Sequence, residues 1–112
     1  MMTIESLKEY GANVEEGLGR CMGNDALYLR LVATIPSDPS FEQLKDSLAA
    51  GDLNTAFERA HALKGVTGNL SLTPLFDPIT KITEHLRAKE DMDYSELLTL
   101  ILSQRDRLKS LC

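Results

Sequence analysis

The stretch RAHALKGVTGNLS, residues 59–71, combines a helical pattern with residues that helix interiors usually avoid. Apolar side chains recur at helical spacing through this stretch and the residues before it, at Leu53, Ala56, Phe57, Ala60, Leu63 and Leu70. Gly65 and Gly68 interrupt the pattern, and each costs about 0.5–1 kcal/mol relative to alanine in a helix interior. The pattern predicts a helix with one buried stripe, and the two glycines need a separate reason.

The two glycines lie on the predicted exposed side of this helix. Residues in a helix are about 100° apart, which places Gly65 and Gly68 within about 60° of His61. The other residues near His61 on this side are Asn54 and Glu58, with Phe57 and Lys64 flanking it, whereas the buried stripe holds Leu53, Ala56, Ala60, Leu63, Thr67 and Leu70. His61 is therefore predicted to face solvent beside two positions that have no side chain.

An exposed histidine of this kind can act as a nucleophile at neutral pH through its unprotonated ring nitrogen. The Lys64 ammonium, one turn further on, favours an anionic group on the ring, and a bare backbone lets a bulky partner approach. These features suit covalent phosphoryl transfer, in which positioning and charge stabilisation dominate. The alternative is a solvated surface histidine near a lysine, with Gly65 serving only close helix packing.

Composition favours a single helical domain over residues 1–112. Of these residues 43% are hydrophobic but only 5% aromatic, which suits helix-on-helix packing better than a β-sandwich. The net charge of −5 argues against nucleic acid or an anionic membrane as the main partner. Cys21 and Cys112 give no disulfide framework, and no signal peptide or membrane-length apolar run is present. We expect a cytoplasmic protein with reduced thiols.

Capping residues and glycines divide the chain into helical segments. Short helices are predicted over residues 4–10, capped by Thr3, over 14–22, capped by Asn13, and over the residues after Asn24, their cap, that precede Pro36. Capping boxes at Ser40 and Gln43 and at Asp93 and Glu96 open helices that run to Gly51 and to about Lys109. Asp52 caps the His61 helix, and Thr73 caps the next one, which Pro78 either kinks or delays.

Strand signals are nearly absent, because alternation of apolar and polar residues never persists. We therefore predict an all-α fold: an antiparallel up-and-down four-helix bundle with short additional N-terminal helices. This architecture by itself does not indicate a function.

The segment AHALKGVTGNLSLTPL resembles the signature of histidine-containing phosphotransfer (Hpt) domains, which reads roughly A-H-x-L-K-G-x-x-x-N-L-G. The matching residues are Ala60, His61, Leu63, Lys64, Gly65, Asn69 and Leu70. The resemblance covers most of the chain, since residues 13–32 and the segment AAGDLNTAFERAHALKG, residues 49–65, also look like the family. It implies a stand-alone phosphocarrier of a two-component phosphorelay.

The resemblance also implies roles for individual residues. His61 would accept a phosphoryl group from the aspartyl phosphate of a receiver domain and pass it to another receiver, with Lys64 neutralising the phosphoryl oxygens. Gly65 and Gly68 would leave room for the partner, and Phe57 and Glu58 would belong to the same partner-binding face. The carrier would need no cofactor, because Mg²⁺ belongs to the acidic pocket of the receiver.

Three positions depart from the family pattern or match it weakly. Ser71 stands where a glycine usually follows Asn-Leu, and its small size predicts little harm. Thr83 matches a position about 22 residues after the histidine, where many members have a polar residue that orients the ring. Arg87, one turn later, matches a position that is sometimes basic and would add positive charge near His61.

Other readings of the chain are weaker. His61 and His85 are not expected to share a metal site, and no nucleophile triad or phosphate-binding loop is present. Autonomous kinase activity is not expected. The expected partners are response-regulator receivers or a hybrid sensor histidine kinase, with the chain a monomer. Two alternatives are the phosphoacceptor domain of a chemotaxis-type histidine kinase and a bundle that binds receivers without carrying phosphate.

Overall fold

The computed structural model describes all residues 1–112, and the chain is entirely helical between its turns. The elements are α1 (Ile4–Tyr10), α2 (Val14–Arg20), α3 (Asp25–Ala33), the 3₁₀-helix η1 (Ile35–Ser37), α4 (Ser40–Ala49), α5 (Leu53–Asn69), α6 (Thr73–Arg87) and α7 (Ser95–Lys109). The all-α prediction is confirmed.

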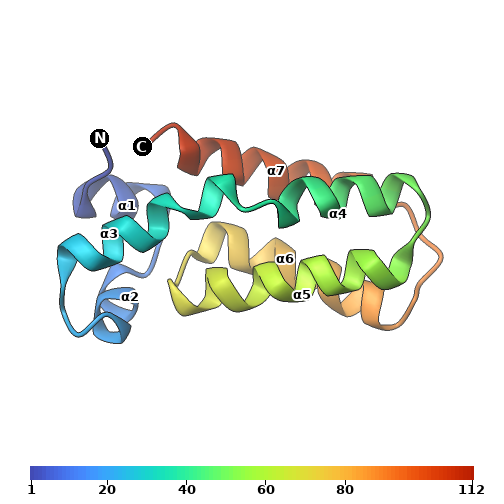
Figure 1. The fold of residues 1–112 in the computed structure, drawn as a ribbon, viewed down its shortest axis with the longest axis horizontal. Helices are drawn as coiled ribbons and strands as arrows, with labels where there is room; N and C mark the ends of the chain where they lie inside the picture. The colour runs from blue at the N-terminus through green and yellow to red at the C-terminus, as the bar shows by residue number, and fades with distance from the viewer.

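Helices α4 to α7 form an antiparallel up-and-down bundle, as predicted (Figure 1). Helix α5 packs on α4 and α6, and α6 packs on α7. The molecule measures 42 × 23 × 19 Å, with the bundle helices along its long axis (Figure 1).

Helices α1 to α3 gather at one end of the bundle, where both chain ends also lie (Figure 1). Two buried tyrosines tie this end together. The Tyr10 hydroxyl donates to the Gln104 carbonyl of α7 at 3.1 Å, and the Tyr28 hydroxyl donates to the Leu70 carbonyl after α5 at 2.8 Å. The Tyr28 ring also lies over Gly17, where an added Cβ would be 2.5 Å from Tyr28 Cε1.

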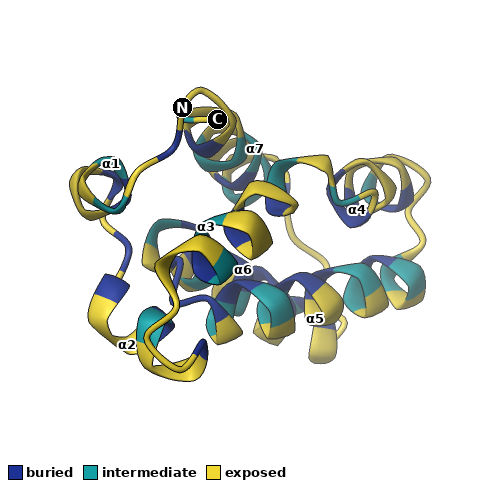
Figure 2. Cartoon of the chain, turned by 60° about the vertical axis from the view of Figure 1, so that its left-hand side comes forward, coloured by how far each residue is buried: buried dark blue, intermediate teal, exposed yellow.

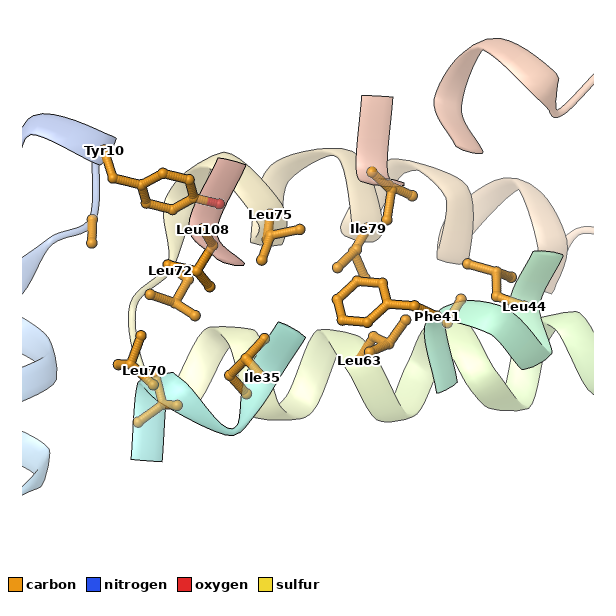
Figure 3. Packing of buried hydrophobic residues seen from close by; sticks show 14 of the residues in the cluster. Tyr10, Ile35, Phe41, Leu44, Leu63, Leu70, Leu72, Leu75, Ile79 and Leu108 are labelled. Carbon is orange, nitrogen blue, oxygen red and sulfur yellow. The ribbon is translucent and has the colours of Figure 1, made fainter. Parts of the chain in front are cut away.

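The core is mainly aliphatic and fills the space between the bundle helices. Figure 3 shows Phe41 of α4, Leu63 of α5 and Ile79 of α6 pointing toward one another, and all three are fully buried. Burying a side chain of this size stabilises the fold by about 1.5–3 kcal/mol. The helices are therefore held together by contacts between their apolar side chains in the bundle core, as the aliphatic composition predicts.

Four predicted N-caps are confirmed, because Thr3, Asn13, Asn24 and Asp52 each accept a backbone N–H with the side chain. The second helix ends at Arg20, two residues before the predicted Met22.

The predicted capping box at Ser40 is wrong. Ser40 lies inside α4 and is buried, and Asp38 Oδ1 accepts its backbone N–H instead at 2.8 Å. The predicted cap at Thr73 is also wrong, because α6 begins with Thr73 and its N-cap, Leu72, has no polar side chain. The predicted capping box at Asp93 and Glu96 is wrong as well: the N-cap of α7 is Tyr94, which has no side-chain cap, although Asp93 accepts the Ser95 N–H at 2.9 Å before the helix.

Helix α6 is continuous through Pro78, which lies inside it and is buried. Both cysteines are free, Cys21 buried and Cys112 exposed. None of the helices combines the length and the apolar character needed to cross a membrane.

Candidate functional site

His61 lies on the exposed side of α5, as the helical wheel predicts. The opposite side of the helix is buried against the bundle through Ala56, Ala60, Leu63 and Thr67. Figure 2 shows this division along α5, with the buried side toward the other helices. The bundle core therefore fixes the direction in which the imidazole points.

An aromatic side chain one turn earlier stacks on the His61 ring. The centroids of Phe57 and His61 are 5.7 Å apart and the ring planes differ by 17°. The Arg87 guanidinium of α6 lies over the Phe57 ring, 5.3 Å from its centroid. Phe57 thus contacts both a cation of α6 and the imidazole of α5.

Two cations and one carboxylate lie between α5 and α6 beside this stack. Lys64 Nζ is 3.9 Å from Glu84 Oε1, and an Arg87 nitrogen is 3.5 Å from the same oxygen. The Lys64 side chain is 29% exposed, so its stem lies against the bundle while its ammonium reaches the edge. The site thus holds two positive groups near His61, with one negative group between them.

The two glycines differ in what surrounds them. A Cβ added at Gly65 would have no atom within 4 Å, so the backbone is open there, as predicted. A Cβ at Gly68 would lie 2.9 Å from Phe76 Cε1. Gly68 therefore lets the Phe76 ring pack on α5, and the prediction that it extends the open surface is wrong.

The geometry is that of an exposed imidazole with nearby cations and an approachable backbone on a four-helix bundle. The family model of the Hpt domain matches residues 30–111, which is most of the chain. The chain belongs to the Hpt domain family. Hpt domains serve histidine phosphotransfer in two-component signalling. Comparisons with curated proteins and with solved structures gave no match.

Thr83 does not take the ring-orienting role that other Hpt domains suggested for it. Its side chain is buried, and its hydroxyl donates to the Ile79 carbonyl of its own helix at 2.7 Å. No hydrogen bond joins Thr83 to His61, so the contact that holds the ring here is the Phe57 stack. Arg87 lies over the Phe57 ring that stacks on His61, which places its guanidinium on the same side of the bundle as the imidazole.

Ser71, where Hpt domains usually have glycine, has a left-handed backbone with φ of 55°. Glycine adopts this region freely, whereas serine does so at a cost. The hydroxyl offsets that cost, since it donates to Glu16 Oε1 and accepts from Arg20, both at 2.8 Å. The hydrogen bond from Ser71 and the Arg20 charge together lower the pKa of Glu16 below its ordinary value.

The Arg20 side chain caps the C-terminal end of α5. One guanidinium nitrogen donates to the carbonyls of Gly68 and Asn69, at 2.8 and 3.2 Å. These are carbonyls that the end of a helix leaves without a partner in its own backbone. The sequence does not reveal this role, because Arg20 is far from α5 along the chain and nothing in its neighbours indicates that contact.

Glu58 and His85 do not pair with Lys64, Arg87 or Glu84. Glu58 is exposed on the His61 side of α5, with its carboxylate 3.9 Å from Arg59. His85 Nδ1 is 2.8 Å from Glu90 Oε2, so this histidine pairs with the turn after α6. No group of three or more histidine, cysteine, aspartate or glutamate side chains lies together as a possible metal site.

Sequence reasoning missed Glu84 and the Phe57 stack. The Glu84 contact depends on how α5 and α6 align, and a wheel drawn for one helix does not contain that alignment; its only signal was the opposite charge of Lys64 and of an acidic residue on the following helix. The Phe57 stack joins two residues one turn apart on α5, so the i, i+4 spacing of Phe57 and His61 was the available signal for it.

Proposed function

We propose that this chain is a phosphocarrier of a two-component phosphorelay, with His61 as the residue that is phosphorylated. The observation that carries the proposal is the exposed His61 ring beside Lys64 and the open backbone of Gly65, on an Hpt fold. The chain would act as an intermediate without kinase activity of its own.

The transfer needs no base from this chain. The unprotonated ring nitrogen of His61 attacks the phosphorus of a receiver aspartyl phosphate, so that a P–N bond forms while the P–O bond to the aspartate breaks. The aspartate leaves as a carboxylate, and the other ring nitrogen keeps its proton. The reverse step onto a second receiver breaks the P–N bond and restores the neutral imidazole.

The cations of the site support this step. A phosphoryl group brings a charge of about −1.5 to −2 near neutral pH and three acceptor oxygens. Lys64 is three residues after His61 and lies on the neighbouring turn, so its ammonium can pair with these oxygens. Arg87 adds a second positive charge from α6, next to the ring that stacks on His61.

The partner would be a receiver domain, supplied by a response regulator or by a hybrid sensor kinase. It would approach the surface formed by Phe57, Glu58, His61, Lys64 and Gly65. Gly65 gives the partner access to the backbone, because no side chain covers it. Mg²⁺ would belong to the receiver, and the carrier would work as a cytoplasmic monomer without a cofactor.

The direct test is transfer from a receiver that carries labelled phosphate. The chain should acquire acid-labile, base-stable label, as expected for a phosphoramidate, and His61→Gln should abolish it. His85→Gln is the matched control, since it removes the one other histidine and should leave labelling unchanged. Label retained in His61→Gln would overturn the assignment.

Lys64→Ala tests the charge stabilisation. It should slow transfer while leaving the unfolding midpoint close to that of the native chain, because the ammonium is not part of the core. A native rate in this variant would remove Lys64 from the mechanism. Receiver binding without any labelling of the native chain would instead support a binding bundle that carries no phosphate.

A further inference from the structure

Glu84 occupies a distinctive place in the site, because one of its oxygens serves both cations. Lys64 Nζ and the Arg87 guanidinium lie 3.9 and 3.5 Å from Glu84 Oε1. Glu84 and Arg87 are one turn apart on α6, whereas Lys64 comes from α5. The carboxylate thus joins the two helices beside His61, and it is 56% exposed.

We propose that Glu84 is a positioning residue that limits how strongly the phosphoryl group is held on His61, and this rests on the proposed function. Before transfer, Glu84 holds Lys64 and Arg87 by their charges. After transfer, the phosphoryl group and Glu84 compete for the same two cations. The carboxylate therefore raises the free energy of phosphorylated His61 relative to the unmodified ring.

The charges around His61 give the direction of this effect. Without Glu84, the local cations would be Lys64 and Arg87 with no acidic partner between them, and a bound dianion would be more favoured. With Glu84, part of that attraction is already satisfied, and the carboxylate also repels the dianion. A carrier gains from this arrangement, because a phosphoryl group that is held too firmly would not pass to the next receiver.

The same charges bound the size of the effect. All three side chains are at least partly exposed, and exposed ion pairs are worth little because water screens them. We therefore expect removal of the Glu84 charge to shift the phosphoryl equilibrium by about two- to five-fold. The shift should be toward His61.

The test measures the equilibrium partition of phosphate between the full chain and a receiver domain. Mixtures that start from the phosphorylated chain and from the phosphorylated receiver should converge on the same ratio. This ratio is the informative quantity, because a residue that only contacts the receiver changes the rate of approach and leaves the equilibrium between the free proteins unchanged.

Glu84→Gln should move the ratio toward the chain, and the shift should shrink as salt screens the charges. Glu58→Gln is the matched control, since Glu58 is an exposed carboxylate near His61 that pairs with Arg59 rather than with Lys64 or Arg87. It should shift the ratio less. In a Lys64→Ala, Arg87→Ala background, Glu84→Gln should shift the ratio much less than in the native chain.

An unchanged ratio in Glu84→Gln, or a shift toward the receiver, would overturn the inference while leaving the phosphocarrier assignment intact. An equal shift in Glu58→Gln would also overturn it, because the cause would then be surface charge in general. If Glu84→Gln shifted the phosphate ratio as much in the Lys64→Ala, Arg87→Ala background as in the native chain, the inference would also be overturned, because the two cations would not be involved. Failure of the native chain to take label on His61 would overturn the proposed function itself.

Discussion

Gly65 and Gly68 are three residues apart on α5 and have opposite surroundings. Open space lies over Gly65, whereas the Phe76 ring lies over Gly68. The first glycine leaves the backbone accessible beside His61, and the second allows α6 to approach α5 closely. Glycine therefore has two different purposes within one turn of the same helix.

Alanine substitution should separate these purposes. Gly65→Ala should raise the free energy of unfolding by about 0.5–1 kcal/mol, because alanine is the better helix former and meets nothing. Gly68→Ala should lower it by about 1 kcal/mol, because overpacking against Phe76 outweighs the gain in helix propensity. Urea unfolding of both variants measures the difference. Equal stabilisation in the two would show that Phe76 moves aside without cost.

Ser71 offers a second test at the scale of one residue. Ser71→Ala keeps the left-handed backbone and loses the hydrogen bonds to Glu16 and Arg20, so the free energy of unfolding should fall by about 1–2 kcal/mol. Ser71→Gly loses the same bonds and relieves the backbone, so it should be more stable than the alanine variant by about 1 kcal/mol. Urea unfolding checks this order, and a glycine variant no more stable than the alanine variant would contradict it.

At the scale of the helices, the sequence predicts those N-termini at which a capping side chain lies directly before the first turn. Asn24 and Asp52 cap helices within three residues of themselves, so their local neighbours contain the signal. Ser40 misled the prediction because Asp38, two residues earlier, accepts its backbone N–H. The Asp38 carboxylate caps the start of α4 in place of Ser40, and this moves the first residue of the helix without changing its apolar periodicity.

Contacts between helices are less readable. His61, Lys64 and Gly65 belong to one helix, and their periodicity placed His61 and Gly65 correctly on its exposed side, with Lys64 at the edge of that side. Glu84 meets Lys64 only because α5 and α6 align in one particular way, and that alignment is set by the whole core. Gly68 was misjudged for the same reason, since its meaning depends on Phe76 of the next helix.

The helix ends also predict how stability depends on acid. Hydrogen bonds to the carboxylate lower the pKa of Asp52, from Thr55, and of Asp93, from Ser95, as the Ser71 bond does for Glu16. A lowered pKa means that, at a pH between the folded and the unfolded pKa, the unfolded chain binds more protons than the folded chain. The contribution is therefore complete above the unfolded pKa, about 4, and is lost as the pH falls through the folded value.

Unfolding measured between pH 7 and pH 3 should show this loss, and Asp52→Asn should reduce it. Asparagine keeps the cap but has no charge to titrate. An unchanged acid dependence in Asp52→Asn would mean that the carboxylate at the start of α5 does not contribute.

At the scale of the whole molecule, the reactive surface and the core are separate. His61 and the cations lie outside the buried stripe of α5, while the helices pack through its opposite side (Figure 2). Helices α1 and α2 lie outside the matched family region, and Arg20 joins them to the end of α5. The proposed phosphorylation of His61 therefore needs no repacking of the interior.

The three tyrosines give this molecule an optical signal for unfolding, because the chain has no tryptophan. Each is buried and donates to a backbone carbonyl: Tyr10 to Gln104, Tyr28 to Leu70 and Tyr94 to Glu90. Burial raises the pKa of Tyr10 and Tyr94 and brings that of Tyr28 to about 12. The folded state then binds more phenolic protons than the unfolded state above pH of about 10.

Alkaline solution should therefore unfold the protein, and tyrosinate absorbance should report it. The tyrosines lie in α1, in α3 and in the turn before α7. A single rise in tyrosinate absorbance that coincides with loss of helical circular dichroism would mean that the bundle and its N-terminal end unfold together. An early fraction of the rise, before the helical signal falls, would mean that one of these anchors opens first.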